Sequence, residues 1–70
     1  MSGVLKINGQ EKTFEEGLPP TVADLLDKLG IHAATVVAEI DGKIVERKDF
    51  SQTNLTSGQS IELIRFVGGG

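Results

Sequence analysis

The residues with the clearest chemical potential are the last three, Gly68-Gly69-Gly70, which follow the apolar pair Phe66-Val67. Glycine has no Cβ, so three in succession cannot pack into a core and lose much conformational entropy when ordered. Such a thread can enter a narrow channel that would reject any larger side chain. We therefore expect the main-chain carboxylate of Gly70 to be the reactive group. The alternative is that these glycines are a frayed terminus or the remains of a linker.

A carboxylate at Gly70 is inert toward nucleophiles at neutral pH because its oxygen is a poor leaving group. Coupling to AMP would give an acyl adenylate, which a sulfur nucleophile can attack. The sequence contains no phosphate-binding loop of its own, since no helix follows the glycines. A partner enzyme would therefore supply the ATP. Residues 67–70, fully extended, would span about 13 Å at roughly 3.3 Å per residue, enough to cross the mouth of an enclosed pocket.

Side chains offer no comparable chemistry. The sequence has no cysteine and a single histidine, so it lacks a disulfide, a thiolate metal site and a cysteine nucleophile. His32 follows the expected end of a helix and is best explained as a loop residue. Asp24 and Asp27 lie one turn apart on the expected solvent face of that helix. The acidic residues elsewhere do not have the spacing of a calcium loop. We expect no metal site, no bound cofactor and no catalysis by this chain itself.

The composition restricts the classes of partner. Seventy residues allow one small domain, which we place at residues 1–67, with 68–70 as a flexible C-terminal tail. The formal net charge is −3, the lysines are scattered, and Trp and Tyr are absent, which argues against nucleic-acid binding. The sequence has neither a signal-peptide pattern nor an apolar run of about 20 residues that could span a bilayer. We expect a cytoplasmic protein that is monomeric when free.

The predicted strands are joined by two hairpin turns. Asn8-Gly9 and Asp41-Gly42 suit type I′ turns, which need positive φ at both central residues. Residues 49–58 are polar, and we expect them to be irregular and anchored by Phe50 and Leu55. The strands are expected at residues 4–7, 10–15, 35–40, 43–47 and 60–67.

One helix is predicted between the two hairpins. Thr21 is a candidate N-cap, and Asp24, three residues later, fits a capping box with Asp in place of Glu or Gln. Gly30 is a candidate left-handed C-cap. Between them an apolar stripe repeats at i, i+3, i+4 and i+7, formed by Val22, Leu25, Leu26 and Leu29. The fold class that follows is α+β: a β-grasp (ubiquitin-like) fold with a mixed four- to five-stranded sheet packed on one helix and the two terminal strands at its centre.

Strand parity separates the two faces of this sheet. The residues expected to face the helix are Leu5, Ile7, Val36, Ile40, Ile61 and Leu63. Val37, Ile64 and Phe66 have the opposite parity, so we expect an apolar group on the open face beside the root of the tail. Exposed apolar groups mark interaction sites. The alternative is that a twist or bulge turns Phe66 inward.

These features together resemble the small, ubiquitin-like β-grasp sulfur carriers of the ThiS/MoaD family. The resemblance covers the whole chain. It rests on the length of 70 and on four segments: the Asn8-Gly9 turn, the helix start Thr21-Val22-Ala23-Asp24-Leu25-Leu26, the polar stretch Thr56-Ser57-Gly58-Gln59-Ser60 and the ending Phe66-Val67-Gly68-Gly69-Gly70. This ending on so short a chain favours the ThiS branch, which serves thiamine biosynthesis.

The resemblance implies a mechanism and partners. An adenylating enzyme of the ThiF type, using ATP and magnesium, would activate Gly70, and a persulfide sulfur donor would convert the product to a thiocarboxylate. Thiazole synthase would accept that sulfur while building the thiazole ring of thiamine. Gly69 and Gly70 match the family's functional diglycine, and Gly68 is an additional glycine. The family's partner-docking face is implied for the residues at the root of the tail and on the open face, Val37, Ile64, Phe66, Val67 and Gly68.

Three alternatives remain open from the sequence. The small subunit of molybdopterin synthase has the same fold and the same thiocarboxylate chemistry, although such chains tend to be longer and to end in two glycines. A ubiquitin-like modifier would instead form an isopeptide bond with a lysine of a target. A non-covalent β-grasp interaction module would carry the glycines incidentally, so deleting Gly69 and Gly70 would leave its partner binding unchanged.

Overall fold

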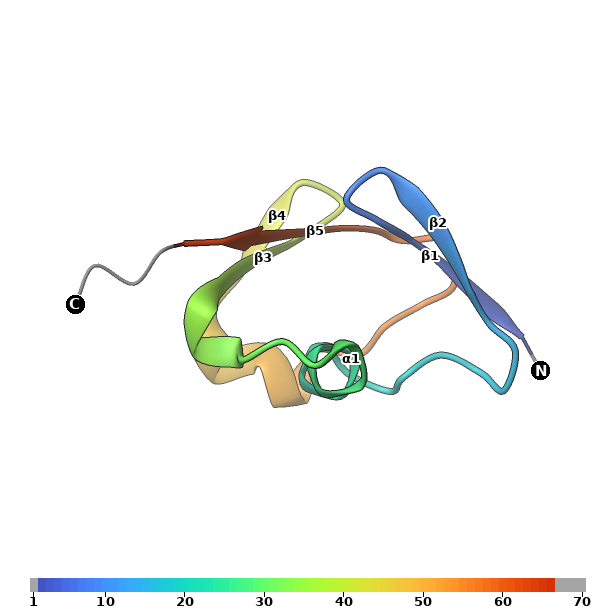
Figure 1. Ribbon diagram of the computed structural model, residues 1–70, viewed down its shortest axis with the longest axis horizontal. Helices are drawn as coiled ribbons and strands as arrows, with labels where there is room; N and C mark the ends of the chain where they lie inside the picture. Colours follow the sequence, from blue (N-terminus) through green and yellow to red (C-terminus); the bar gives the residue numbers. More distant parts are fainter. Residues whose placement is uncertain (1, 67–70) are drawn as a thin grey trace.

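The computed structural model describes residues 2–66, which form a five-stranded mixed sheet with one α-helix across one face (Figure 1). The elements are β1 (Gly3–Ile7), β2 (Gln10–Phe14), α1 (Val22–Leu29), the 3-10 helix η1 (Ala33–Thr35), β3 (Val36–Ile40), β4 (Lys43–Val45), the 3-10 helix η2 (Arg47–Gln52) and β5 (Ser60–Arg65). The strand order is β2-β1-β5-β3-β4, with β1 and β5 parallel and the other pairs antiparallel. The predicted β-grasp fold is confirmed, with five strands and the first and last strands adjacent at its centre.

The helix begins and ends at the residues that the sequence predicts. The Thr21 side chain accepts a hydrogen bond from the Asp24 amide at 3.2 Å, and its hydroxyl donates to the Asp24 carboxylate at 2.8 Å. Gly30 adopts the left-handed conformation with φ 72°, and the Ile31 amide donates to the Leu26 carbonyl at 2.9 Å. These bonds satisfy groups that helix ends leave unpaired, so a helix of eight residues has defined limits.

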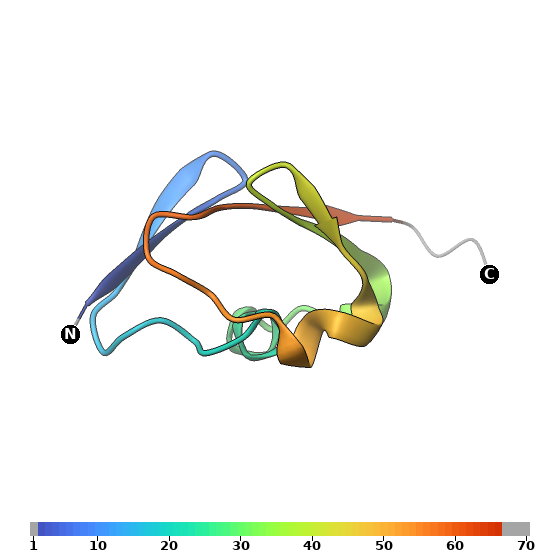
Figure 2. The same ribbon diagram turned by 180° about the vertical axis from the view of Figure 1, so that it is seen from behind.

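The core lies between α1 and the inner face of the sheet. Figure 2 shows α1 and the η2 segment beneath the sheet, on the side away from the two hairpin tips. The inward parity assignments are confirmed: Ile7 is half-buried against the core, and the other five side chains are buried. Their partners from the opposite layer are Val22, Leu25, Leu26 and Phe50.

Both hairpin turns hold β5 in place. Asn8 and Asp41 each have φ 50°, as type I′ turns require. The Asn8 side chain accepts from the Leu63 amide at 2.8 Å and donates to the Leu63 carbonyl at 3.3 Å, which extends the β1–β5 ladder beyond the end of β1. On the other side of β5, the Asp41 carboxylate accepts from the Ser60 amide at 2.9 Å. The last strand is therefore fixed from both neighbours near its middle and its start.

Several predicted boundaries differ from those observed. β2 ends at Phe14 rather than residue 15. β3 begins at Val36, because Thr35 closes η1 by donating from its amide and its hydroxyl to the His32 carbonyl at 3.0 and 2.8 Å. β5 ends at Arg65, with Phe66 just outside it. The difference at β3 arises because a local side-chain hydrogen bond competes with strand pairing.

The segment after β4 departs most from the prediction. β4 stops at Val45, and residues 47–52 form η2 instead of irregular chain. The Thr53 hydroxyl donates to the Asp49 carbonyl at 2.7 Å, and Phe50 is buried in the core. The anchoring role predicted for Phe50 is confirmed. A helical turn brings this side chain into the core, and the polar composition of the segment does not predict that turn.

Candidate functional site

Two of the predicted docking residues lie side by side on the open face. Val37 and Ile64 are direct partners in the antiparallel register of β3 and β5. Their exposed fractions are 36% and 49%, whereas the flanking residues Val36 and Leu63 are buried. Residues that oppose each other on adjacent strands project from the same face. The predicted apolar group therefore exists on the side of the sheet away from α1.

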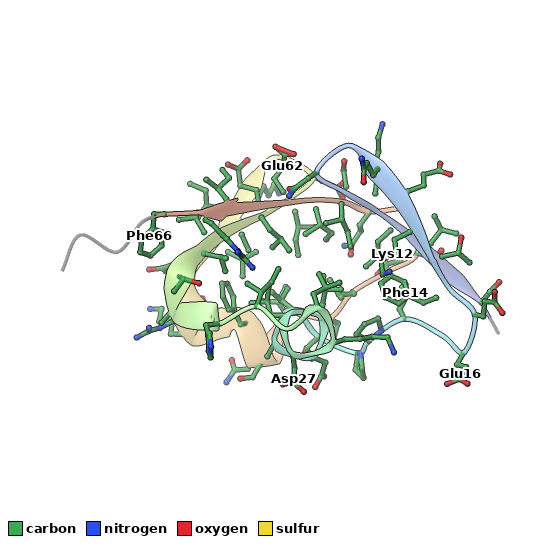
Figure 3. The ribbon with its side chains drawn as sticks, viewed as in Figure 1. Lys12, Phe14, Glu16, Asp27, Glu62 and Phe66 are labelled. Carbon is green, nitrogen blue, oxygen red and sulfur yellow. The ribbon has the colours of Figure 1, made fainter. Side chains whose placement is uncertain are left out.

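Phe66 is exposed at the end of β5. Its amide donates to the Thr35 carbonyl at 3.1 Å, which continues the β3–β5 register past the last strand residue. Figure 3 shows Phe66 at the outer end of β5 and Glu62 farther back, on the face away from α1. The exposed fraction of Phe66 is 47%, so the alternative in which a twist buries this ring is wrong. Its role in partner binding stays a prediction.

One exposed apolar residue, Ile44 of β4, was not predicted from the sequence. Its exposed fraction, 68%, is higher than that of Val37 or Ile64. Ile44 is the register partner of Glu39, which alternates with two buried residues of β3 and so faces outward. The signal was present in the sequence, because Ile44 and Val45 are adjacent apolar residues in a strand and project to opposite faces. Val45 packs against the core, so Ile44 faces away from it. We define the open-face group as Val37, Ile44 and Ile64.

Two carboxylates lie beside this open-face group. Glu39 of β3 opposes Glu62 of β5 on one side and Ile44 of β4 on the other. Within residues 2–66, the one ion pair closer than 4.0 Å joins Lys48 and Glu46, and it is well exposed. Neither Glu39 nor Glu62 therefore has a cationic neighbour at that distance in this part of the chain. The open face combines apolar side chains with negative charge.

The tail itself lies outside the described residues. The predictions for Val67, Gly68, Gly69 and Gly70, namely the docking contact, the flexible thread, the reactive carboxylate and the domain limit at residue 67, all concern that segment. The structure shows what precedes it: β5 is hydrogen bonded on both sides up to Leu63 and to β3 as far as Phe66. The tail thus starts from a well-anchored strand.

The described residues offer little support for a side-chain active site. No group of three His, Cys, Asp or Glu residues within 2–66 is placed to hold a metal ion. One surface hollow, with a volume of about 460 Å³, lies between the first hairpin and the end of α1. Its lining residues, which include no nucleophile paired with a base, are Ile7, Asn8, Gln10, Glu11, Lys12 and Leu29. No helix in this part of the chain is long and apolar enough to cross a membrane.

Comparisons with known proteins give a consistent result. The ThiS family model matches residues 4–70. A thiazole synthase of Paramagnetospirillum magneticum is 35% identical over 66 residues, which are 94% of this chain and 20% of that protein. The chain therefore spans about a fifth of the length of this curated relative.

Solved structures of a thiamine biosynthesis protein (ThiS) from Geobacter metallireducens are also similar. The crystal structure superimposes with a TM-score of 0.83 at 32% identity, covering 96% of this chain and 99% of that one. The solution NMR structure gives a TM-score of 0.78 at the same identity, covering 96% and 87%. The likeness thus extends over the whole sheet and helix.

Proposed function

The chain belongs to the ThiS family of thiamine biosynthesis proteins, and on this premise we propose that it carries sulfur on the carboxylate of a C-terminal Gly70. The observation that supports this most directly is that the family match runs through residue 70 and so includes all three final glycines. The anchored end of β5 and the exposed apolar residues beside it fit a protein that docks by its body and presents its end.

The proposed reaction has three balanced steps. The Gly70 carboxylate attacks the α-phosphorus of magnesium-bound ATP, and pyrophosphate leaves. The terminal sulfur of a persulfide then attacks the carbonyl carbon of the acyl adenylate, and AMP leaves. A second thiol reduces the resulting acyl disulfide, which forms a new disulfide and releases the thiocarboxylate. The adenylating enzyme would supply the ATP site and the magnesium, so this chain acts as a co-substrate rather than as the catalyst.

The proposed partners are a ThiF-type adenylating enzyme, a persulfide donor and thiazole synthase. Support for the last comes from the Paramagnetospirillum thiazole synthase, which includes a segment similar to this chain. A pair that is joined in one polypeptide in one organism is a reasonable pair of binding partners in another. We place the chain in the cytoplasm as a free monomer, without nucleic-acid or membrane partners.

Intact-mass analysis tests this function. The protein is incubated with Mg-ATP, a ThiF-type enzyme and a sulfur source, and we expect the mass to rise by the difference between sulfur and oxygen. Deletion of Gly69 and Gly70 should abolish the change while leaving thermal unfolding unaltered. An unchanged mass of the wild-type chain would refute a sulfur-carrier role. Stable adducts with other proteins would indicate a modifier, and sulfur delivered only to a molybdopterin precursor would indicate the molybdopterin synthase subunit.

A matched pair of variants tests the narrow-channel argument. Gly69→Val should slow adenylate formation by about 100-fold or more, because a branched side chain would displace the carboxylate from its reacting geometry. Gly69→Ala should be intermediate, since its side chain is smaller. Both variants should unfold like the wild type. Equal adenylation rates for all three proteins would show that the channel does not select for glycine.

A further inference from the structure

We propose that the open face binds its adenylating enzyme through an arginine of that enzyme placed over Glu39 and Glu62, with apolar side chains around it. This inference rests on the proposed function, which supplies the partner. Two like charges, Glu39 and Glu62, are paired across β3 and β5.

The register places the two carboxylates directly opposite each other. The Asp41 amide donates to the Ser60 carbonyl at 2.8 Å, and the Phe66 amide donates to the Thr35 carbonyl at 3.1 Å. Bonded pairs alternate along an antiparallel ladder, so Glu39 and Glu62 also form a bonded pair, with Cα atoms about 5.5 Å apart. Figure 3 shows the Glu62 side chain on the face away from α1.

This arrangement is unfavourable in the free protein. Like charges directly opposite on neighbouring strands are destabilising. Lys6, the lysine of the adjacent strand β1, is the register partner of Ser60 rather than of Glu62. It makes no ion pair within 4.0 Å among the described residues. The repulsion between the two glutamates therefore has no direct compensation within this part of the chain.

Docking on this face would bury the negative charge. Ile44 flanks Glu39 on β4, and Val37 with Ile64 forms the next outward row along β3 and β5. A partner that covers these three apolar side chains must also cover Glu39, which is already half-buried. Burying a carboxylate without a partner is costly. The covering surface must therefore supply positive charge at that point.

Arginine fits this requirement better than lysine. Its planar guanidinium carries several donors in a fixed fork, so a single side chain can donate to two adjacent carboxylates. It is also less strongly hydrated than an ammonium group and packs well against apolar neighbours such as Ile44 and Ile64. On binding, the repulsion between Glu39 and Glu62 would be replaced by an arginine that bridges the two carboxylates. The face would therefore favour partners that carry a cation at this position and disfavour partners that do not.

The test measures binding and stability on the same variants. We expect Glu39→Gln/Glu62→Gln to raise the urea midpoint of unfolding by about 0.3 M, because the repulsion is removed. The same variant should raise the KM for adenylation by a ThiF-type enzyme about tenfold or more and weaken its dependence on salt. The control Glu11→Gln/Glu15→Gln changes the net charge equally, on and just after β2, and should alter neither KM nor its salt dependence appreciably.

The outcomes separate the two proposals. A wild-type chain that is never adenylated would overturn the proposed function and this inference with it. Wild-type adenylation combined with an unchanged KM for Glu39→Gln/Glu62→Gln would overturn the inference alone. An equal rise in KM for the Glu11 and Glu15 control would also overturn it, since general charge attraction would then be sufficient.

Discussion

The two faces of β5 differ sharply although their residues alternate along one strand. Ile61 and Leu63 have exposed fractions of 1% and 7%, while Ile64 is 49% exposed and Glu62 also faces solvent. The inner side chains pack against α1 and η2, so they contribute to the free energy of folding. The outer ones stabilise the monomer little, and Glu62 opposes another carboxylate. The inner face therefore meets the demands of folding, whereas the outer face keeps apolar side chains exposed that folding does not require.

The largest test of this comparison is a matched pair of truncations on β5. Ile61→Ala should lower the free energy of unfolding by about 3 kcal/mol, because it leaves a cavity in the core. Ile64→Ala, the same chemical change on the outer face, should alter it by less than about 0.5 kcal/mol. Urea denaturation followed by circular dichroism measures both. Similar losses for the two variants would show that the outer face is also part of the folding core.

A smaller loss of stability is expected from the polar contact between Asn8 and Leu63, which holds β1 and β5 in register. Asn8→Ala should cost about 2 kcal/mol, because it removes two hydrogen bonds to Leu63 and because Ala tolerates the left-handed conformation less well than Asn. Asn8→Gly keeps the turn geometry and should cost about half as much. The same denaturation experiment checks both variants. If Asn8→Gly were as stable as the wild type, the side-chain contact with Leu63 would contribute nothing and the turn alone would set the register.

The exposed ring at the end of β5 should show its effect in activity. Phe66→Ala should lower kcat/KM for adenylation about tenfold, or about 1.4 kcal/mol, because interface aromatics carry much of the binding energy. Its stability should change by less than about 0.5 kcal/mol, since the ring is half-exposed at the end of β5. Leu63→Ala is the contrasting variant. Because Leu63 is buried, the main effect of this change should be a lower free energy of unfolding. An unaltered kcat/KM for Phe66→Ala would remove this ring from the docking surface.

The sequence predicted the elements whose local signals and tertiary environment agree. Asn8-Gly9, Thr21 and Gly30 all adopt the turn or cap geometry expected from their residue types, because those geometries are set within a few residues. The inward residues of β1, β3 and β5 followed from period-two alternation. The outward position of Val37 and Ile64 came from the same rule, applied where an apolar residue broke the pattern.

The errors occurred where a longer-range contact decides the local structure. Phe50 must reach the core from a short polar connection, and a 3-10 turn is the conformation that brings it there. The composition of that segment does not predict a helix. The opposed pair Glu39–Glu62 was also not foreseen, because register across two distant strands is not written in either strand alone.

The smallest expected effect is at Ile44, where it distinguishes the two edges of the outer face. This residue is the most exposed large apolar residue among those described, at 68%, and it lies on the edge strand β4 beside Glu39. Ile44→Thr keeps the β-branched shape and strand propensity, so the free energy of unfolding should stay within about 0.5 kcal/mol of the wild type. If Ile44 contacts the partner, kcat/KM should fall about threefold, because an ethyl group is exchanged for a hydroxyl in a surface that loses its water on binding. Thr13→Val, an outward change on the opposite edge strand β2, serves as the control and should leave kcat/KM unchanged. A fall in kcat/KM for Thr13→Val alone would place the docking surface at the β2 edge of the outer face instead of the β4 edge.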